Sequence, residues 1–342
     1  MMAQPSLDPL EQPTLVAPPK AFVRELCDGQ AVDSVFVVRD RTRRLKKNGD
    51  PFLKLRLADV TGTCEAVMWD GVDDCFAACA VGSAVRVAGA FSVDSRYGAT
   101  LTLRGLRAAD DSEYEPTDLH DASPLAFDQM VADLRSLIAT VQSPPLRALL
   151  RRFFADDSEV WTRWSRAPAA KHYHQAYRHG LLEHCLTVAQ AVGAASATFP
   201  GIDRDVAVTG ALLHDIGKIE AYAEVGEGIE MTDAGRLQGE IPLGYHMVRR
   251  EIESMTGFPS DTAQAVLHII LSHHGALEHG SPVVPCTREA TLVHMMDNLG
   301  GRLGSFDRIE KTLSQGEQWS SFDRGISSAA YFAARDDGLH AA

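Results

Sequence analysis

The sequence lacks the paired cysteines of a disulfide-dependent or zinc-binding protein. None of its six cysteines forms a Cys-x-x-Cys pair, and no small loop-rich framework surrounds them. Small secreted domains are often dense in disulfides, so the pattern predicts reduced thiols and a cytoplasmic protein. Cys75 and Cys79 lie one helical turn apart, but no second pair is near enough to complete a zinc site. We expect both to be buried.

A signal peptide and a long apolar run are also lacking. The first 20 residues contain five prolines and no basic start followed by an apolar stretch. They are expected to form a disordered tail and not a signal peptide. The most apolar segment, residues 181–199, is interrupted by polar side chains such as Glu183 and His184. Such a segment is too polar to cross a lipid bilayer.

Positive charge is scarce in the chain as a whole. The net charge of -13 argues against a protein that coats a polyanion with its entire surface, because phosphate binding needs clustered Lys and Arg. Residues 21–108 are the exception, with 13 Lys and Arg against 11 Asp and Glu, while the rest of the chain has 20 against 35. Any nucleic-acid contact is therefore expected in this part of the chain. A length of 342 residues predicts two folded domains.

The first domain, residues 21–109, is expected to be a small β-barrel. Alternating and β-branched residues separated by turn signals predict five strands, at residues 32–38, 52–58, 64–69, 84–91 and 100–106. A short helix-like segment, residues 73–80, falls between the third and fourth strands. Five strands with a helix at this place are typical of the OB-fold, which grips oligonucleotides on one face and with two of its loops.

Both of these loops carry suitable side chains. Between the first and second strands lies a basic run that we expect to be a loop, made of Arg39, Arg41, Arg43, Arg44, Lys46 and Lys47. The loop between the fourth and fifth strands carries Arg96 and Tyr97. Exposed aromatic side chains can stack on bases, and the candidates are Phe36, Phe52, Trp69 and Tyr97. The alternative is that the basic run is an ordinary solvated loop and that the aromatic residues belong to the core.

The remainder of the chain is expected to be all-helical. Residues 110–122 are acidic and lack apolar periodicity, which predicts a linker. Ser123 and Pro124 resemble a helix start, and apolar residues at helical spacing follow. The second domain is therefore placed at residues 123–310, with a C-terminal segment at residues 311–342. The fold class is a multidomain protein with a small all-β barrel in front of an all-α domain.

Histidines and acidic residues gather in this second domain. His214 and Asp215 end an apolar helix in "ALLHDIGK", and His184 lies on the apolar face of "HGLLEHCLTVAQ". His273 and His274 end the helix "LHIILSHHG", and Asp297 follows an apolar run in "LVHMMDNLG". A buried carboxylate without a cation is costly. Several helices that each supply nitrogen or oxygen ligands therefore predict a divalent metal site.

These residues resemble the H...HD...D signature of the HD superfamily of metal-dependent phosphohydrolases. The spacings are 30 residues from His184 to His214, 58 from Asp215 to His273 and 24 from His273 to Asp297. With the OB-like barrel in front, the chain resembles the YhaM-type 3'-5' exoribonucleases. The resemblance extends through "PAAKHYHQAYRHGLLEH", "TDAGRLQGEIPLG", "SHHGALEHGSPVVP" and "DNLGGRL".

The resemblance implies two divalent ions, Mn²⁺ or Mg²⁺, with iron, cobalt or nickel as alternatives. The first ion would be held by His184, His214, Asp215 and Asp297. The second would be held by Asp215, His273 and either Glu240 or His246. This choice stays open because the family has a histidine after the glycine where this chain has Gly239-Glu240. Many family members also have glycine at the position of His179.

The implied reaction removes 5'-mononucleotides from the 3' end of single-stranded RNA, with DNA as a less favoured substrate. The metal ions would activate a water for attack on the last phosphodiester. Asp215, Lys218, His246 and His274 are the catalytic candidates, and His172, His174 and Arg178 are further candidates for substrate contact. Two alternatives remain, a phosphohydrolase of a small nucleotide or cyclic dinucleotide, and a nucleic-acid-binding module with a decayed metal site.

Overall fold

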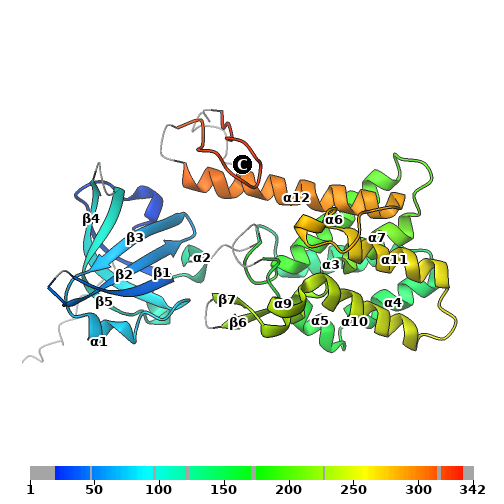
Figure 1. The fold of residues 1–342 in the computed structure, drawn as a ribbon, viewed down its shortest axis with the longest axis horizontal. Coiled ribbons are helices and arrows are strands. Elements are labelled where there is room, and N and C mark those ends of the chain that lie inside the picture. Colours follow the sequence, from blue (N-terminus) through cyan, green and yellow to red (C-terminus); the bar gives the residue numbers. More distant parts are fainter. Residues whose placement is uncertain are drawn as a thin grey trace, which may run out of the picture.

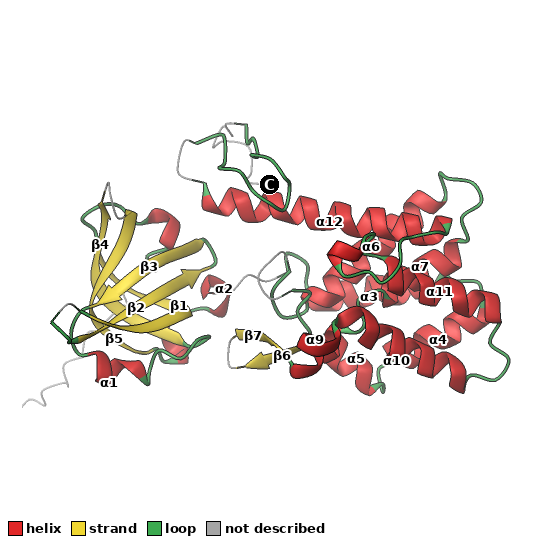
Figure 2. Ribbon diagram, viewed as in Figure 1, coloured by secondary structure: helices red, strands yellow, loops and turns green. Residues whose placement is uncertain are grey.

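The protein is described by a computed structural model. It describes residues 20–46, 48–94, 98–119, 123–170, 175–225, 228–313 and 317–333. Figure 1 shows a β-barrel at the blue and cyan end of the chain and a helical domain formed by the green to orange part. In Figure 2, the long strands lie in the barrel and nearly all helices lie in the second domain. The expected fold class is therefore confirmed.

The first domain is a closed barrel with the strand order β1-β2-β3-β5-β4. Neighbouring strands are antiparallel, except for the parallel pair β3 and β5. The strands are β1 (Ala31–Leu45), β2 (Pro51–Asp59), β3 (Gly62–Met68), β4 (Ala84–Asp94) and β5 (Gly98–Ala108). The short helix α1 (Val72–Phe76) lies between β3 and β4, and the 3-10 helix η1 (Val23–Glu25) precedes the barrel. This is the OB-fold order that the sequence predicts.

Every second side chain along the strands points into the barrel and fills its core. On β2, Leu53, Leu55 and Leu57 are buried, while the residues between them include the partly exposed Lys54 and the exposed Arg56. This period of two sends successive side chains to opposite faces of the sheet. Phe36 also belongs to this core, with no exposed surface. Its proposed role as a base-stacking residue was therefore wrong, because its ring cannot reach a ligand.

The basic run is strand and not loop. β1 continues to Leu45, and its second half pairs with β2 in a register that shifts between Val38 and Asp40. Arg44 lies opposite Phe52, and Leu45 lies opposite Pro51. The prediction of a loop failed because hydrogen bonds to β2 hold this polar segment extended, although it lacks an apolar face. Lys47, Arg96 and Tyr97 lie outside the described residues.

Much of the acidic segment packs against the barrel, which differs from the expected linker. It forms the 3-10 helix η2 (Asp111–Glu113) and the helix α2 (Pro116–Leu119). Leu119 is fully buried against Val35 and Val37 of β1. Glu113 accepts hydrogen bonds from Arg107 at 2.6 Å and from Arg86 at 3.0 Å. The apolar contact and the ion pairs fix a segment whose sequence shows no periodicity.

The second domain packs its helices around one continuous apolar core. The helices are α3 (Phe127–Ala139), α4 (Pro144–Phe154), α5 (Glu159–Trp164), α6 (Gly180–Ser196), α7 (Arg204–Leu213), α8 (Lys218–Ala221), α9 (Asp233–Gln238), α10 (Glu240–Ser254), α11 (Ser260–Ser272), the 3-10 helix η3 (Leu277–His279) and α12 (Arg288–Thr312). A small hairpin of β6 (Tyr222–Val225) and β7 (Gly228–Met231) is an exception to the all-helical expectation. In the described part of the chain, no helix is both long and apolar enough to span a membrane.

Phe36→Ala is expected to destabilise the barrel by about 3 to 5 kcal/mol, because it removes a fully buried aromatic ring and leaves a cavity. Val93→Ala is the control, since Val93 is 54% exposed and its loss should cost less than about 0.5 kcal/mol. Scanning calorimetry of both variants measures the difference. Equal stability of the two variants would contradict the placement of Phe36 in the core.

Candidate metal centre and nucleic-acid interface

Four helices bring the expected ligands to one place. His184 lies on α6, His214 and Asp215 follow the last residue of α7, His273 follows α11, and Asp297 lies within α12. α7 is central because it packs against α6, α11 and α12. His184, His214, Asp215 and His273 are buried, and the side chain of Asp297 is 17% exposed. Residues that are far apart in the sequence thus converge inside the domain.

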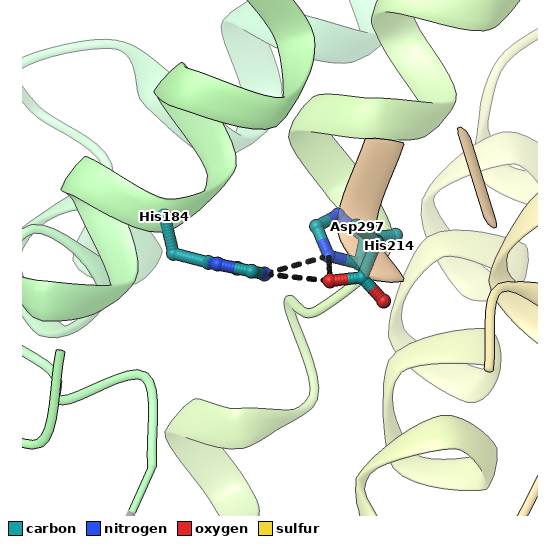
Figure 3. Close-up of side chains that lie close together, drawn as sticks. All are labelled: His184, His214 and Asp297. Atoms are coloured by element: carbon teal, nitrogen blue, oxygen red, sulfur yellow. Dashed lines mark hydrogen bonds and ion pairs between the residues drawn. The ribbon is translucent and has the colours of Figure 1, made fainter. Parts of the chain in front are cut away.

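The first ligand cluster is formed by His184, His214, Asp215 and Asp297. His184 Nε2 lies 3.1 Å from Asp297 Oδ1 and 3.2 Å from His214 Nε2, and Figure 3 shows these side chains pointing toward one another. Asp215 Oδ2 lies 3.3 Å from the Nε2 atoms of both histidines. Ligand atoms bound to one ion at about 2.1 Å lie roughly 3.0 to 3.4 Å from each other. Four of the separations in the cluster therefore have the spacing of ligands on one ion, while His214 Nε2 lies farther from Asp297 Oδ1, at 3.9 Å. His184, His214 and Asp297 form a group that could hold a metal ion.

The outer nitrogens of the imidazoles show which atoms face inward. Nδ1 of His214 bonds the carbonyl of Ala211 at 2.7 Å, and Nδ1 of His273 bonds the carbonyl of Ile270 at 2.8 Å. A carbonyl oxygen only accepts, so each Nδ1 must donate and carry a hydrogen. In the neutral ring, Nε2 then presents a lone pair to the centre. This is the usual arrangement of metal-ligating histidines.

The second cluster shares Asp215. Asp215 Oδ1 and His273 Nε2 are 3.5 Å apart, and both are buried atoms without a hydrogen-bond partner among the described residues. Unsatisfied buried polar atoms are rare and call for an explanation. A cation between them would satisfy both. Asp215 points one oxygen at each cluster, and His274 belongs with Asp215 and His273 to the second group that could hold a metal ion.

The charges of the cluster favour a cation. Burial opposes ionisation of Asp297, but hydrogen bonding to His184 and the nearby His214 hold its pKa below the ordinary value. Burial likewise disfavours the charged form of His184, but hydrogen bonds to Asp215 and Asp297 raise its pKa to about 9. Burial also opposes ionisation of Asp215, but the nearby Lys218 and His214 hold its pKa well below the ordinary value. Both carboxylates therefore remain negative at neutral pH. The donor set of imidazoles and carboxylates fits a divalent metal ion.

The other catalytic candidates lie at different distances from these clusters. Lys218 Nζ is 2.6 Å from Asp215 Oδ2, and its side chain is only 14% exposed. His274 Nε2 lies 3.9 Å from Glu240 Oε1 at the rim of the second cluster. His246 is an exposed residue of α10. Neither His246 nor Glu240 belongs to the potential ligand groups found among the described residues, in which His274 is the third member beside Asp215 and His273.

The candidates for substrate contact are only partly described. Arg178 is an exposed residue just before α6, while His172 and His174 lie outside the described residues. His179 caps α6 with a φ of 69°, in the left-handed region. Glycine would adopt this conformation without steric cost. The His179 ring bonds the carbonyl of Ser165 through Nδ1 and packs against Phe127, with ring centroids 4.5 Å apart.

Glu240 is positioned by a close backbone contact between Gly217 and the start of α10, which includes Gly244. A Cβ atom on Gly217 would lie 2.0 Å from the backbone oxygen of Glu240 and 2.4 Å from the nitrogen of Gly244. Only a residue without a side chain fits such a backbone contact. The glycine of "HDIGK" therefore lets α10 approach the turn that carries Asp215. This approach brings Glu240 to the rim of the site.

Sequence reasoning missed two residues that orient the ligands. Gln175 Oε1 lies 3.1 Å from Nδ1 of His184. His294, three residues before Asp297 on α12, donates from Nδ1 to the carbonyl of His273 at 2.7 Å. His294 fits there because Gly275 has no Cβ, which would lie 2.2 Å from its ring. The spacing of His294 and Asp297 was the available signal, since residues three apart share a helix face.

The outer face of β1, β2 and β3 carries the candidate nucleic-acid interface. The rings of Phe52 and Trp69 stack with centroids 5.0 Å apart, and Trp69 is 44% exposed. Arg44 lies across from Phe52, and Lys46 Nζ lies 6.0 Å from the Trp69 ring. Exposed aromatics beside cations are suited to stack on bases and bind phosphates.

The other basic residues differ in their surroundings. Arg41 donates to the carbonyl of Phe76 at 2.6 Å and stacks over its ring, so it fastens α1 to the barrel. Arg39 and Arg43 are exposed residues of β1. Lys54 and Arg56, which sequence reasoning missed, pair with Glu65 on the outer face at 2.8 and 3.4 Å. The basic surface thus extends beyond the predicted run.

Comparisons with known proteins agree with this architecture. Residues 181–301 match the HD domain family. The 3'-5' exoribonuclease YhaM of Geobacillus sp. (strain WCH70) is 28% identical over 84% of this chain and 88% of its own length. The protein of the same name from Bacillus subtilis (strain 168) is 29% identical over 84% of this chain and 90% of its own.

Solved structures match a part of this chain about the size of the barrel. The second OB-fold domain of replication protein A from Methanococcus maripaludis has 16% identity and a TM-score of 0.23, and covers 27% of this chain and 97% of its own. The small single-stranded DNA-binding protein from Streptomyces coelicolor has 18% identity and a TM-score of 0.22, and covers 26% of this chain and all of its own.

Fold and site together define an HD-domain hydrolase that depends on a divalent metal ion. The chain is similar to the 3'-5' exoribonucleases named YhaM, and the resemblance predicted from its motifs is confirmed.

His294→Ala is expected to weaken metal binding by about 10- to 100-fold, because the carbonyl of His273 loses its donor and the ligand loses its support. Isothermal titration with Mn²⁺ measures the affinity. His279→Ala is the control, since His279 lies on the exposed turn η3. An unchanged affinity of a folded His294→Ala protein would contradict this positioning role.

Proposed function

We propose that this chain is a metal-dependent 3'-5' exonuclease that acts on single-stranded RNA. The observation that carries the proposal is a pair of buried ligand clusters sharing Asp215, in a chain whose barrel exposes aromatic and basic side chains on one face. The names of the relatives support the direction of attack and the preference for RNA over DNA. The reaction hydrolyses the terminal phosphodiester and releases a 5'-mononucleotide.

The ligand assignment follows the two clusters. His184, His214, Asp215 and Asp297 would hold one ion, and Asp215, His273 and Glu240 would hold a second. When bound, such ions lower the pKa of a water and polarise the phosphate. Manganese and magnesium are the proposed metals, because carboxylate ligands suit both.

Lys218 and His274 would assist the reaction from the rim. Burial opposes the charge of Lys218, but Asp215 raises its pKa above the ordinary value, so the ammonium stays positive beside the site. A fixed positive charge stabilises the negative charge that develops on the phosphate. Nδ1 of His274 bonds the carbonyl of His279 at 2.8 Å, so its Nε2 is the nitrogen that can accept a proton.

The barrel would supply the substrate strand. Stacking on Phe52 and Trp69 requires unpaired bases, so we expect the enzyme to stall at duplexes. Arg44, Lys46, Lys54 and Arg56 would contact phosphates, which makes binding weaken as salt rises. Neither interaction reads base identity, and little sequence preference is expected.

Digestion of end-labelled single-stranded RNA tests the activity. With Mn²⁺ or Mg²⁺, a 5'-labelled strand should give a ladder that shortens from its 3' end, and chelator should abolish it. Asp215→Asn should lower the rate by more than about 1,000-fold, because both clusters lose the charge of their shared ligand. Glu220→Gln, which removes a surface partner of Arg163, is the control. Fragments from internal cleavage, or full activity of Asp215→Asn, would refute the proposal.

Trp69→Ala tests the role of the barrel. Loss of one stacking ring should raise KM for single-stranded RNA by about 5- to 100-fold, because each stacked base contributes roughly 1 to 3 kcal/mol. Hydrolysis of bis(p-nitrophenyl) phosphate, which is too small to reach the barrel, should not change. Trp319→Ala is the matched control, since Trp319 is a similarly exposed tryptophan at 62%. Equal KM values for both variants would favour a small nucleotide as the substrate.

A further inference from the structure

The strand register shows which side chains lie next to one another on the outer face of the barrel. At one end of this face, the ring of Phe52 on β2 stacks on Trp69, which follows β3. Farther along the same strands, Arg56 lies between Asp40 of β1 and Glu65 of β3. Residues separated by an even number of positions share a face of a strand. The proposed RNA-binding face therefore contains carboxylates as well as aromatic and basic side chains.

The carboxylate of Glu65 bridges two cations of this face. Its Oε2 lies 2.8 Å from Lys54 Nζ, and its Oε1 lies 3.4 Å from Nε and Nη2 of Arg56. The hydrogen bond from Lys54 lowers the pKa of Glu65, so the carboxylate is charged at neutral pH. The exposed fractions of the side chains are 43% for Lys54, 57% for Arg56 and 36% for Glu65. An anion in solution can therefore reach both cations.

Glu65 presents the same kind of acceptor as an RNA backbone. A phosphodiester carries a single negative charge that is shared by its non-bridging oxygens, and a carboxylate shares the same charge between its oxygens. Lysine and arginine form charge-assisted hydrogen bonds with both groups. Exposed ion pairs are weak enough to exchange with another partner. A phosphate that binds Lys54 and Arg56 must therefore take the place of Glu65.

A second carboxylate of this face is held less firmly. Asp70 Oδ1 lies 3.2 Å from Lys46 Nζ, but Asp70 follows the end of β3 and its side chain is 93% exposed. Glu65 lies within β3 and contacts cations on the neighbouring strand β2. Of the two acidic residues, Glu65 is therefore the one whose position the sheet fixes.

We propose that Glu65 is a built-in competitor of the RNA backbone that limits how tightly the barrel binds single-stranded RNA. The inference rests on the proposed function, in which this face receives the substrate strand. The strand must break the ion pairs of Glu65 before its phosphates can bind Lys54 and Arg56, and this loss reduces the affinity. A limited affinity suits an exonuclease, because the strand has to advance after each cleavage.

Fluorescence anisotropy of a 5'-labelled oligouridylate with the full chain tests the competition, with chelator present to prevent digestion. Glu65→Gln should bind about 3- to 10-fold more tightly at low salt, because Lys54 and Arg56 no longer have a charged partner. The gain should shrink as salt rises, because salt screens exposed ion pairs. Unchanged or weaker binding would overturn the proposal, since Glu65 would then be neutral or would hold the cations in place for the strand.

Asp33→Asn is the matched control. Asp33 is also a barrel carboxylate paired with an arginine, since its Oδ1 lies 2.8 Å from Nε of Arg86 on β4. This variant should change the affinity by less than about 2-fold. Glu65→Thr, which cannot replace the carboxylate by an amide, should show the same gain as Glu65→Gln. A gain as large in Asp33→Asn would overturn the specific role of Glu65.

A second background separates competition for the two cations from a general loss of negative charge. In a chain that carries Lys54→Ala and Arg56→Ala, the further change Glu65→Gln should not raise the affinity, because the competing ion pairs are absent. A gain of the same size in this background would overturn the competition. With Mn²⁺, Glu65→Gln in the otherwise unchanged chain should lower KM for the same RNA by the factor seen in binding.

The same measurements distinguish failure of this inference from failure of the proposed function. RNA binding that Trp69→Ala weakens, without any gain from Glu65→Gln, would overturn the competition alone. A chain without measurable affinity for the labelled strand would refute the substrate proposed for the barrel, and the role of Glu65 with it.

Discussion

The helical domain is organised around negative charge that is buried without enough hydrogen-bond donors. Asp215 and Asp297 meet the Nε2 atoms of His184 and His214 inside the domain, and Asp215 faces His273 with an oxygen that has no partner among the described residues. Without an ion, protonation of His184 is the available compensation, and its raised pKa reflects this. A divalent cation would satisfy the same atoms directly. The fold therefore buries negative charge that a bound divalent cation would compensate.

The surrounding packing makes this arrangement rigid. Gly217 and Gly244 allow α10 to approach the turn after α7, and His294 joins α12 to the carbonyl of His273. The backbone carbonyls that bind the outer imidazole nitrogens fix the direction of each ring. Loss of such supporting contacts typically weakens metal affinity or activity about 10- to 100-fold.

The elements that the sequence predicted correctly are those whose residue patterns depend on near neighbours along the chain. The five strands and the helix between the third and fourth were recognised from alternation and turns, and the ligand histidines from their places at the ends of apolar helices. The basic run from Arg39 to Leu45 lacks an apolar face, so its sequence predicts a loop. Its extended conformation comes from pairing with β2, a contact between separate segments that no local pattern reveals. The packing of Leu119 of the acidic segment against β1 is likewise a contact between separate segments.

The neighbours of Glu240 could not be predicted from the sequence either, because its 3.9 Å approach to His274 joins α10 to the end of α11. Anomalous diffraction from crystals grown with Mn²⁺ measures the central claim most directly. The account places a manganese peak among His184, His214, Asp215 and Asp297, with a second beside His273 that shares Asp215. Crystals saturated with Mn²⁺ that show ordered side chains and no anomalous peak among these residues would contradict it.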